Sequence, residues 1–203
     1  MNKSKIKKFI KKIYYKSCEK IWFLRCIAET EGSGAPITLK NIITQKIFGF
    51  NRSAYWPVHK NSRVTGIKWI KIGEHTAPGA SFGCYIFAAE NAEIKIGAYT
   101  TMAPNVCIAG FNHNIYNIHE YVSKGGIDIG KYCWLGMNST VLSGVKLGDH
   151  TVVAANSVVT KSFPDGYCVL AGNPAKIVKI IDRKDVREYI HPYKYVGYRK
   201  IRE

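Results

Sequence analysis

The sequence predicts an all-β protein built around a parallel β-helix, in which short strands and turns wind into a prism. Two observations carry this prediction. Aliphatic residues recur at every sixth position from Ile129 to Val159, and small residues such as Gly136 and Gly148 directly follow some of them. A period of six fits neither an amphipathic helix, with its period of about 3.6, nor a meander of hairpins. It is the hexapeptide signature of a parallel β-helix.

The repeat predicts which side chains point into the prism. Its aliphatic positions are Ile129, Leu135, Val141, Leu147, Val153 and Val159, and an upstream run places Ile72, Ile96, Met102 and Ile108 in the same way. We expect Pro78, Cys84 and Glu90 to fill the intervening upstream positions. Each buried aliphatic side chain contributes roughly 1.5–3 kcal/mol. Three repeats, or about 18 residues, complete one turn, so residues 54–180 are predicted to hold the β-helix, with residues 54–71 as a looser first coil.

One interruption divides the repeat. Ile108 and Ile129 are 21 positions apart, which is not a multiple of six. Residues 110–126 are therefore predicted to leave the prism as a loop. A loop of more than about 12 residues inside a regular domain is usually functional or disordered, and this one carries His113, His119 and several aromatic residues. We interpret it as an active-site loop.

Basic segments flank the predicted β-helix. Within residues 1–53, Ile6, Phe9 and Ile10 recur at helical spacing among lysines, which predicts an amphipathic helix. Packing of its apolar stripe on the prism or on a neighbouring subunit is the favoured interpretation. Attachment to an anionic membrane surface is the alternative. Residues 181–203 are predicted to form a basic C-terminal tail with a short helix.

The composition restricts the compartment and the partners. Thirty Lys and Arg against fourteen Asp and Glu give a formal net charge of +16, which is concentrated at the two ends. No nucleic-acid-binding motif accompanies this charge, so we expect no nucleic-acid partner. The six cysteines form no CxxC pair, which indicates buried thiols in a reducing compartment rather than zinc ligands or disulfides. We therefore expect a cytoplasmic protein, whose contact with the inner membrane, if the alternative above holds, is peripheral.

Residues 94–179 contain motifs that resemble those of a known family. They include IDIGKYCWLGMNSTVLSGVKLGDHTVVAANSVVTKSFPDG and LAGNPAKIVK. This stretch resembles the hexapeptide-repeat acyltransferases, especially the maltose, galactoside and nodulation-type O-acetyltransferase branch. The resemblance implies a left-handed β-helix, a homotrimer, and an acetyl-CoA site in each cleft between two prisms. It also implies that a histidine of the extruded loop acts as the base, which corresponds here to His113 in IAGFNHNIYN.

The resemblance also implies the cofactor and acceptor residues. Trp134 matches a tryptophan near the acceptor and the pantetheine arm, and Met137 and Ala155 fall where the coil backbone lines the pantetheine groove. Lys176 and Lys179 match basic residues near the nucleotide phosphates. The expected acetyl-CoA residues are Trp134, Gly136, Met137, Ala154, Ala155, Thr160, Lys161, Pro174, Lys176 and Lys179, and the expected acceptor residues are Asn112, His119 and Trp134. No metal site is expected.

The chemistry of acetyl transfer explains why a histidine is needed. A sugar hydroxyl is a poor nucleophile, and imidazole, with an unperturbed pKa of about 6.5, is mostly neutral at pH 7 and can accept its proton. The sequence has no GxSxG elbow and no cysteine paired with a base, which favours direct transfer over an acyl-enzyme. His119 either lines the acceptor cleft or is simply exposed. His75 and His150 occupy turn positions and are expected to be solvated.

The sequence therefore predicts acetyl-CoA-dependent O-acetylation of a bacterial cell-surface saccharide (capsule, O-antigen or exopolysaccharide) or of its precursor. Asn114 follows His113 where the maltose-type branch commonly has proline, so we expect an acceptor other than maltose or a galactoside. Two alternatives stay open, which are N-acetylation of an amino sugar on the same fold and a non-catalytic trimeric scaffold. A metal-dependent hydratase is disfavoured because His75, His113 and His119 show no ligand spacing.

Overall fold

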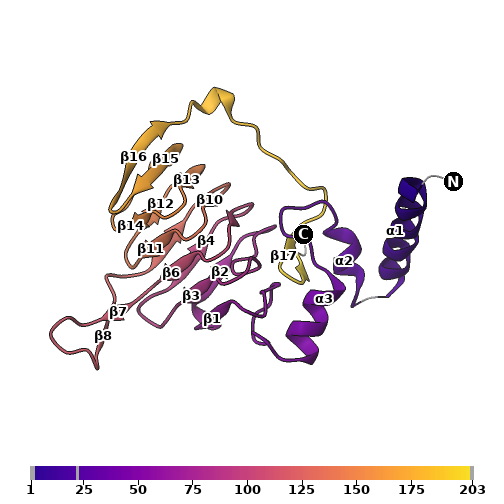
Figure 1. Cartoon of the computed structure of the whole chain (residues 1–203), viewed down its shortest axis with the longest axis horizontal. Coiled ribbons are helices and arrows are strands. Elements are labelled where there is room, and N and C mark those ends of the chain that lie inside the picture. The colour runs from indigo at the N-terminus through magenta and orange to yellow at the C-terminus, as the bar shows by residue number, and fades with distance from the viewer. Residues whose placement is uncertain (1–2, 22, 202–203) are drawn as a thin grey trace.

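A coil of short strands, with helices at one end, makes up the protein (Figure 1). The computed structural model describes residues 3–21 and 23–201.

In this part of the chain the strands of the coil form three sheets, which the chain visits in turn. Sheet I contains β1 (Arg63–Thr65), β3 (Tyr85–Phe87), β6 (Cys107–Ala109), β11 (Thr140–Leu142) and β14 (Val158–Val159). Sheet II contains β2 (Ile70–Ile72), β4 (Ile94–Ile96), β9 (Ile127–Ile129) and β12 (Lys146–Leu147). Sheet III contains β5 (Thr101–Met102), β10 (Trp134–Leu135), β13 (Thr151–Val153), β15 (Cys168–Gly172) and β16 (Ala175–Ile180).

Neighbouring strands of these sheets are parallel, and their side chains stack in rows inside the coil. Only β16 runs antiparallel, along β15, among the described strands of sheets I to III. The inward rows are Val64, Ile86, Ile108, Val141 and Val159 from sheet I, Ile72, Ile96, Ile129 and Leu147 from sheet II, and Met102, Leu135, Val153 and Leu170 from sheet III. All are buried except the half-buried Met102. The predicted coil of parallel strands with inward aliphatic residues is therefore confirmed.

The upstream coil is longer than the repeat predicts. Ile129 lies beside Leu147, 18 positions later, whereas Ile72 lies beside Ile96, 24 positions later. Because 24 is also a multiple of six, counting by sixes stays in phase across this coil although the coil is not built from equal repeats. The sequence count therefore hides the added residues.

Two of the three upstream assignments are wrong for this reason. Pro78 is buried as expected, but Ile86, and not Cys84, takes the inward position beside Ile108. Cys84 is buried two residues earlier. Glu90 is exposed, in a turn closed by a bridge between Ala89 and Ala92. This turn holds four of the six added residues, because Ile96 follows Ile86 by ten positions whereas Leu147 follows Val141 by six, and the other two lie between Ile72 and Ile86.

The N-terminal cap closes one end of the coil. It contains α2 (Arg25–Glu29), α3 (Leu39–Ile42) and the π-helical turn Ile43–Ile47. Gln45 is fully buried, and its side-chain amide donates to the carbonyl oxygens of Ala54 and Trp56. A buried amide must find partners for its polar atoms, so these bonds fix where the chain enters the first coil.

Helix α1 (Lys3–Lys20) lies outside the coil and contacts α2. Its apolar residues Phe9, Ile10 and Ile13 are exposed, at 61%, 60% and 51%, whereas Cys18 is buried in a small cluster with Cys26 and Tyr195. The apolar stripe therefore does not pack on the prism, and this part of the favoured interpretation is wrong, whereas packing on a neighbouring subunit stays a prediction. The helix is joined to the described residues by its C-terminal end and by an ion pair between Lys11 and Glu31. In the described part of the chain no helix is long and apolar enough to cross a bilayer.

The C-terminal segment runs back along the outside of the coil, from β16 to the N-terminal cap, where β17 (Tyr195–Val196) and β18 (Arg199–Lys200) form a hairpin (Figure 1). The expected short C-terminal helix is absent from residues 181–201. A single 3₁₀ turn, Arg183–Asp185, stands in that stretch. A few backbone groups of the segment bond to the coil, as in the bond from the His75 N–H to the Tyr195 carbonyl.

This segment covers a column of stacked rings at the corner between sheets II and III. The column consists of His75, Tyr99, Tyr132, His150 and Tyr167, whose neighbouring ring centroids are 4.7–5.0 Å apart. Each of these residues has a positive φ, which repeats the same corner in successive coils and superimposes the rings. His75 and His150 are only 3% and 8% exposed. The expectation that they are solvated is wrong, because ring stacking and the returning C-terminal segment bury them.

Candidate functional site

The chain leaves the coil between β6 and β9 and forms an antiparallel hairpin of β7 (Asn112–His113) and β8 (Tyr121–Val122) (Figure 1). The hairpin is anchored where it joins the coil. Ser123 Oγ donates to the carbonyl of Gly110 at 2.7 Å, and the Gly144 N–H of the next coil donates to the carbonyl of Gly125 at 3.1 Å. The interruption of the repeat is thus an ordered projection.

The hairpin holds His113 in one tautomer. Its exposed ring lies 4.6 Å from the Tyr121 ring, and its Nδ1 lies 2.7 Å from the carbonyl oxygen of Ile118. A hydrogen bond from Asn117 to the Glu120 carboxylate, 2.8 Å long, closes the turn that carries this carbonyl. Because a carbonyl oxygen can only accept, Nδ1 carries a proton, and in the neutral ring the lone pair is therefore on Nε2. An imidazole oriented in this way can accept a proton through Nε2.

A groove of about 600 Å³ opens beside the base of the hairpin. Phe111 and Tyr121, whose rings meet edge to face at 5.4 Å, form one part of its lining. Glu90 and Asn91 contribute a carboxylate and an amide. Apolar walls with a few polar groups are typical of small-molecule sites. Glu90 enters this groove because the long upstream coil turns it outward.

Trp134 lies on the outer face of sheet III, with 53% of its surface exposed. The strand register continues from Trp134 to Val152, then to Val169, and from Val169 to Lys179 of β16. Trp134 and Lys179 therefore belong to one outward row, separated by two valines. This arrangement offers an apolar strip with a cation at one end.

The corner between sheets III and I carries Gly136, Met137, Ala154 and Ala155. The Gly136 N–H donates to the carbonyl of Val153 at 2.8 Å, which stacks one coil on the next. A Cβ at Gly136 would lie 2.7 Å from the Ala155 nitrogen, so this position requires glycine. Met137 and Ala155 are exposed, and the corner therefore presents a shallow strip of backbone and small side chains.

The other expected cofactor residues lie elsewhere on the coil. Thr160 and Lys161 are exposed at the corner between sheets I and II, the corner from which the hairpin projects. Pro174 lies in the turn between β15 and β16, and Lys176 of β16 lies beside Ala171. Both lysines of β16, Lys176 and Lys179, are exposed.

The expected site residues thus form two groups within one chain. His113 lies with Asn112 and His119 on the hairpin at the corner between sheets I and II, whereas Trp134 and Lys179 lie on sheet III. In a three-sided coil, sheet III is the face opposite that corner. The chain does not bring His113 to the row of Trp134 by itself, and a site that contains both groups requires two chains.

The described residues give little support to catalysis by a cysteine nucleophile or by a bound metal ion. Burial raises the pKa of the Cys133 thiol to about 11 and also raises that of Cys107, so neither supplies a thiolate nucleophile near neutral pH. Within residues 3–21 and 23–201, no group of three or more His, Cys, Asp or Glu side chains is placed to hold a metal ion.

Three residues at the hairpin have contacts that the sequence analysis did not assign. They are Ile118, whose carbonyl orients His113, and Phe111 and Tyr121, whose rings line the groove. The aromatic character of Phe111 and Tyr121 was visible in the sequence. The pairing of His113 with Tyr121 across the hairpin was not, because it depends on the turn that follows His113.

Comparisons with known proteins agree with the repeat and with the fold. The family described as "Bacterial transferase hexapeptide (six repeats)" matches residues 126–161. The chain is 33% identical over 106 residues to the galactoside O-acetyltransferase of Escherichia coli K12, covering 50% of this chain and 51% of the relative. It is 37% identical over 107 residues to WbbJ of the same strain, which is named as an O-acetyl transferase of lipopolysaccharide biosynthesis, covering 47% and 54% of the two chains.

Among solved structures, a hexapeptide-repeat acetyltransferase of Vibrio cholerae O1 biovar eltor, VCA0836, complexed with acetyl coenzyme A, superimposes with a TM-score of 0.50. It is 25% identical and covers 68% of this chain and 78% of its own. The chain spans about half the length of the curated relatives it matches. These matches agree with the resemblance that the motifs indicated: residues 126–161 match the hexapeptide repeat, and about half of the chain is similar to proteins named as O-acetyltransferases.

Proposed function

We propose that this protein transfers the acetyl group of acetyl-CoA to a hydroxyl of a bacterial cell-surface saccharide or its precursor, with His113 as the general base. The observation that carries the proposal is the bond between His113 Nδ1 and the Ile118 carbonyl, which makes Nε2 the nitrogen that can accept a proton when the ring is neutral. Relatives that are named for galactoside O-acetylation and for lipopolysaccharide biosynthesis support the reaction and the class of acceptor.

In the proposed reaction, His113 Nε2 accepts the proton of the acceptor hydroxyl while that oxygen attacks the thioester carbonyl carbon. The bond between this carbon and sulfur then breaks, and the imidazolium returns the proton to the departing thiolate. The products are an acetyl ester and CoA with a free thiol. The Ile118 carbonyl accepts from Nδ1–H throughout, which favours the positive charge that the ring carries between the two proton transfers.

The exposed residues of the coil fit acetyl-CoA as the acetyl donor. The shallow strip at Met137 and Ala155 suits an extended pantetheine arm, and Lys176 and Lys179 supply point charges for phosphates. Gly136, Ala154, Thr160, Lys161 and Pro174 complete the proposed contacts. The acetyl-CoA complex of the Vibrio cholerae protein supports this donor.

The groove beside the hairpin is the proposed acceptor site. Phe111 and Tyr121 offer ring faces to the apolar side of a sugar, and Glu90 and Asn91 offer acceptors and donors to its hydroxyls. Asn112 and His119, on the same hairpin, and Trp134 of a neighbouring chain are proposed to complete the contacts to the acceptor.

We infer a left-handed coil and a homotrimer, in which the hairpin of one chain meets sheet III of the next. The outer faces of the coil support such an assembly. The outward row of sheet II is charged and consists of Lys71, Lys95, Asp128 and Lys146. The corresponding row of sheet I begins with the charged Arg63 and continues with the uncharged residues Tyr85, Cys107, Thr140 and Val158. Charged rows favour solvent, whereas the uncharged part of the sheet I row, from Tyr85 to Val158, can be buried between subunits.

We also infer peripheral contact of α1 with the cytoplasmic face of an anionic membrane. The helix has eight lysines and one acid, Glu19, together with the exposed apolar residues Phe9, Ile10 and Ile13. An amphipathic helix of this composition lies in the plane of a membrane surface. The cysteines of the described chain are free thiols, which supports a reducing compartment.

The test is acceptor-dependent release of the CoA thiol by the full-length protein, measured with a panel of saccharides and with His113→Ala protein as the blank. We expect release with hydroxyl acceptors and a product that mild base hydrolyses, as an ester requires. A base-stable amide formed only with amino sugars would replace O-acetylation by N-acetylation. Absence of acceptor-dependent release across the panel would favour the scaffold.

A further inference from the structure

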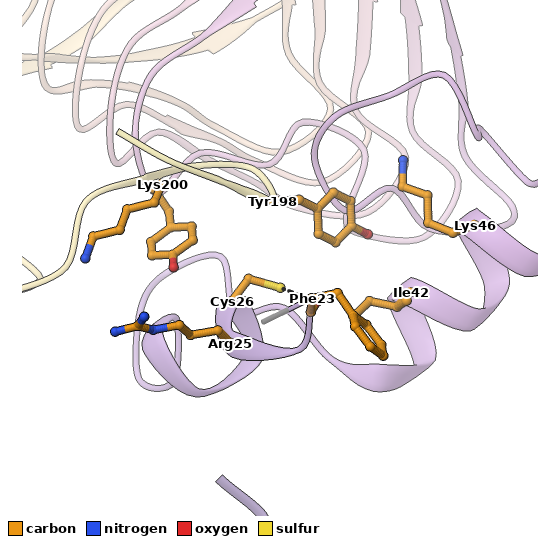
Figure 2. A pocket seen from close by; sticks show the side chains of 8 residues that line it. Phe23, Arg25, Cys26, Ile42, Lys46, Tyr198 and Lys200 are labelled. Atoms are coloured by element: carbon orange, nitrogen blue, oxygen red, sulfur yellow. Dashed lines mark hydrogen bonds between the residues drawn. The ribbon is translucent and has the colours of Figure 1, made fainter. Parts of the chain in front are cut away.

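A cavity of about 580 Å³ lies in the N-terminal cap (Figure 2). No residue of the β7–β8 hairpin, which carries His113, or of sheet III lines it. Phe23, Cys26 and Ile42 line one side of it, from α2, α3 and the segment before α2. Tyr198, from the β17–β18 hairpin, lies on the other side, and Tyr195 of β17 also lines the cavity. Rings, an aliphatic side chain and a thiol make these walls apolar.

The polar atoms of the walls are already bonded to other residues. The Tyr198 hydroxyl donates to Gln45 at 2.8 Å, and the Tyr195 hydroxyl donates to the Glu29 carboxylate at 2.9 Å. Burial raises the pKa of the Cys26 thiol, which therefore stays neutral. The cavity thus offers apolar surface and few free hydrogen-bonding groups, which suits an apolar chain.

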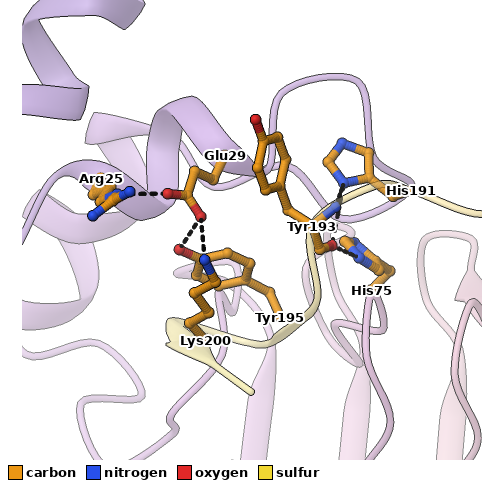
Figure 3. Close-up of polar contacts among 7 residues, drawn as sticks. All are labelled: Arg25, Glu29, His75, His191, Tyr193, Tyr195 and Lys200. Carbon is orange, nitrogen blue, oxygen red and sulfur yellow. Dashed lines mark hydrogen bonds and ion pairs between the residues drawn. The ribbon is translucent and has the colours of Figure 1, made fainter. Parts of the chain in front are cut away.

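One end of the cavity is positively charged. Arg25 Nε donates to Glu29 at 2.5 Å, and Lys200 Nζ lies 3.8 Å from the other oxygen of the same carboxylate (Figure 3). Two cations therefore share one carboxylate, which also accepts the Tyr195 hydroxyl. The side chains of Arg25 and Lys200 are 60% and 56% exposed, so both keep donors available to an anion at this mouth.

Lys46, which also lines the cavity, adds to the excess of positive charge. Its Nζ donates to the carbonyls of Arg52 and Ala54. Its pKa is lowered, first by burial and then by repulsion from Arg52 and Arg199. Lys46 lies on the side of the cavity away from Arg25 and Lys200 (Figure 2) and therefore does not belong to the cationic mouth.

From the apolar walls, the cationic mouth and the exposed basic face of the adjoining α1, we propose that this cavity holds one acyl chain of an anionic membrane lipid. The lipid head group lies between Arg25 and Lys200. The inference deepens the membrane contact proposed for α1, on which it rests, by naming a lipid-binding site. A site that takes one chain out of the bilayer orients the protein on the membrane, whereas an amphipathic helix alone gives adhesion.

The first experiment measures binding of two soluble lipids with the same chains, dioctanoyl phosphatidylglycerol and dioctanoyl phosphatidylcholine, to the full-length protein. We expect the anionic lipid to bind roughly tenfold more tightly, a factor that matches one charge-assisted hydrogen bond. Lys200→Gln should remove most of that preference. Equal binding of the two lipids, or binding of neither, would overturn the proposal.

A pair of variants on α3 tests the cavity itself. Ile42→Trp places a larger side chain in the cavity wall, whereas Leu39→Trp makes the same change at an exposed residue of the same helix that does not line the cavity. We expect Ile42→Trp to weaken binding of dioctanoyl phosphatidylglycerol at least tenfold and Leu39→Trp to leave it unchanged. Equal affinity in both variants would place the lipid elsewhere. A change of oligomeric state in Ile42→Trp, measured by sedimentation, would assign the cavity to a neighbouring copy and overturn the lipid proposal.

Flotation with lipid vesicles distinguishes membrane binding through this cavity from membrane binding through α1. On vesicles that contain phosphatidylglycerol, Phe9→Ser with Ile10→Ser tests the contact of α1, and Ile42→Trp tests the cavity. We expect each to reduce the bound fraction. Loss with the α1 variant alone would keep the membrane contact and reject the lipid site. If the unmodified protein does not float with the vesicles, the membrane contact is rejected. If the protein then still binds the soluble lipid, the cavity binds a lipid that does not come from a bilayer.

Discussion

His113 and His75 make the same hydrogen bond with opposite nitrogens, and the difference separates a reactive histidine from a structural one. His113 bonds the Ile118 carbonyl through Nδ1 and exposes Nε2 on the hairpin. His75 bonds the Tyr193 carbonyl through Nε2, and its Nδ1 is buried with no hydrogen-bond partner among the described residues. Both bonds fix a tautomer. Only at His113 can the remaining lone pair meet a substrate.

The surroundings of the two rings also differ, because the ring of His75 is buried among other rings whereas that of His113 is exposed. The ring of His75 stacks on Tyr99 at 5.0 Å and lies 4.8 Å from the ring of His191. Burial lowers its pKa, repulsion from His191 adds to this, and the Tyr193 carbonyl and Glu74 oppose it. A buried neutral imidazole of this kind links the C-terminal segment to the coil. The comparison shows that exposure of the free nitrogen, and not the presence of a histidine at a turn, marks the candidate catalytic residue.

The largest expected effect is on turnover at the hairpin. His113→Ala should lower kcat by roughly 10²–10⁴-fold, the range for loss of a general base, with acetyl-CoA binding retained. Steady-state release of the CoA thiol measures this. Tyr116→Ala is the matched control because Tyr116 is 92% exposed at the tip of the same hairpin. Equal losses in the two variants would show that the hairpin acts only as a structural element.

The next effect is on stability at the ring column. His75→Ala should lower the free energy of unfolding by about 2–5 kcal/mol, because it removes a large buried side chain and leaves a cavity. Denaturant unfolding measures the change, and turnover per folded molecule should stay constant. The hairpin supplies the contrasting variant, since His119→Ala replaces an exposed ring and should change stability by no more than about 0.5 kcal/mol. Similar destabilisation by both would contradict the distinction between the two regions.

A smaller effect is expected at the proposed nucleotide contacts. Lys176→Ala with Lys179→Ala should raise the KM for acetyl-CoA by roughly tenfold through loss of charge-assisted contacts, without a matching loss of kcat. The double variant should also discriminate less between CoA and dephospho-CoA. If the unmodified enzyme uses both cofactors equally well, these lysines do not contact the phosphates.

The smallest effect is the pH dependence of stability from His75. The pKa of this residue is lowered from 6.5 in the folded chain, so the unfolded chain binds more protons at mildly acidic pH. The stabilisation is present above pH 6.5 and is lost as the pH falls through the lower, folded value. His75→Tyr keeps a ring in the column, as at Tyr99 and Tyr132, and should flatten this part of the curve of Tm against pH. An unchanged slope in the variant would assign the dependence to other groups.

The regular part of the coil was predictable because its signal is local. Leu135, Val141 and Leu147 repeat at six positions, and the structure places each of them inside. The interruption before Ile129 likewise followed from a simple count. The upstream coil was harder because its 24 positions imitate four repeats, and only the pairing between neighbouring strands shows that Ile86 replaces Cys84.

The surroundings of the histidines could not be read from local pattern. Burial of His75 depends on Tyr193, more than one hundred positions away, and on the return of the C-terminal segment along the coil. The tautomer of His113 depends on a carbonyl, which every residue has and which no sequence motif identifies. His113 itself was accessible through its place in the interruption and through the family resemblance, whereas the proposal that two chains form the site rests on the faces on which its parts lie.

The most direct test of the proposed chemistry is the structure of the assembled protein bound to CoA and an acceptor saccharide. We predict that Nε2 of His113 lies within hydrogen-bonding reach of the acceptor hydroxyl, at about 3 Å or through one water, and that the CoA sulfur lies on the other side of that hydroxyl, in a cleft formed with sheet III of a neighbouring chain. A His113 ring that faces away from the cleft, or a pantetheine arm bound elsewhere, would contradict the assignment of this residue as the base.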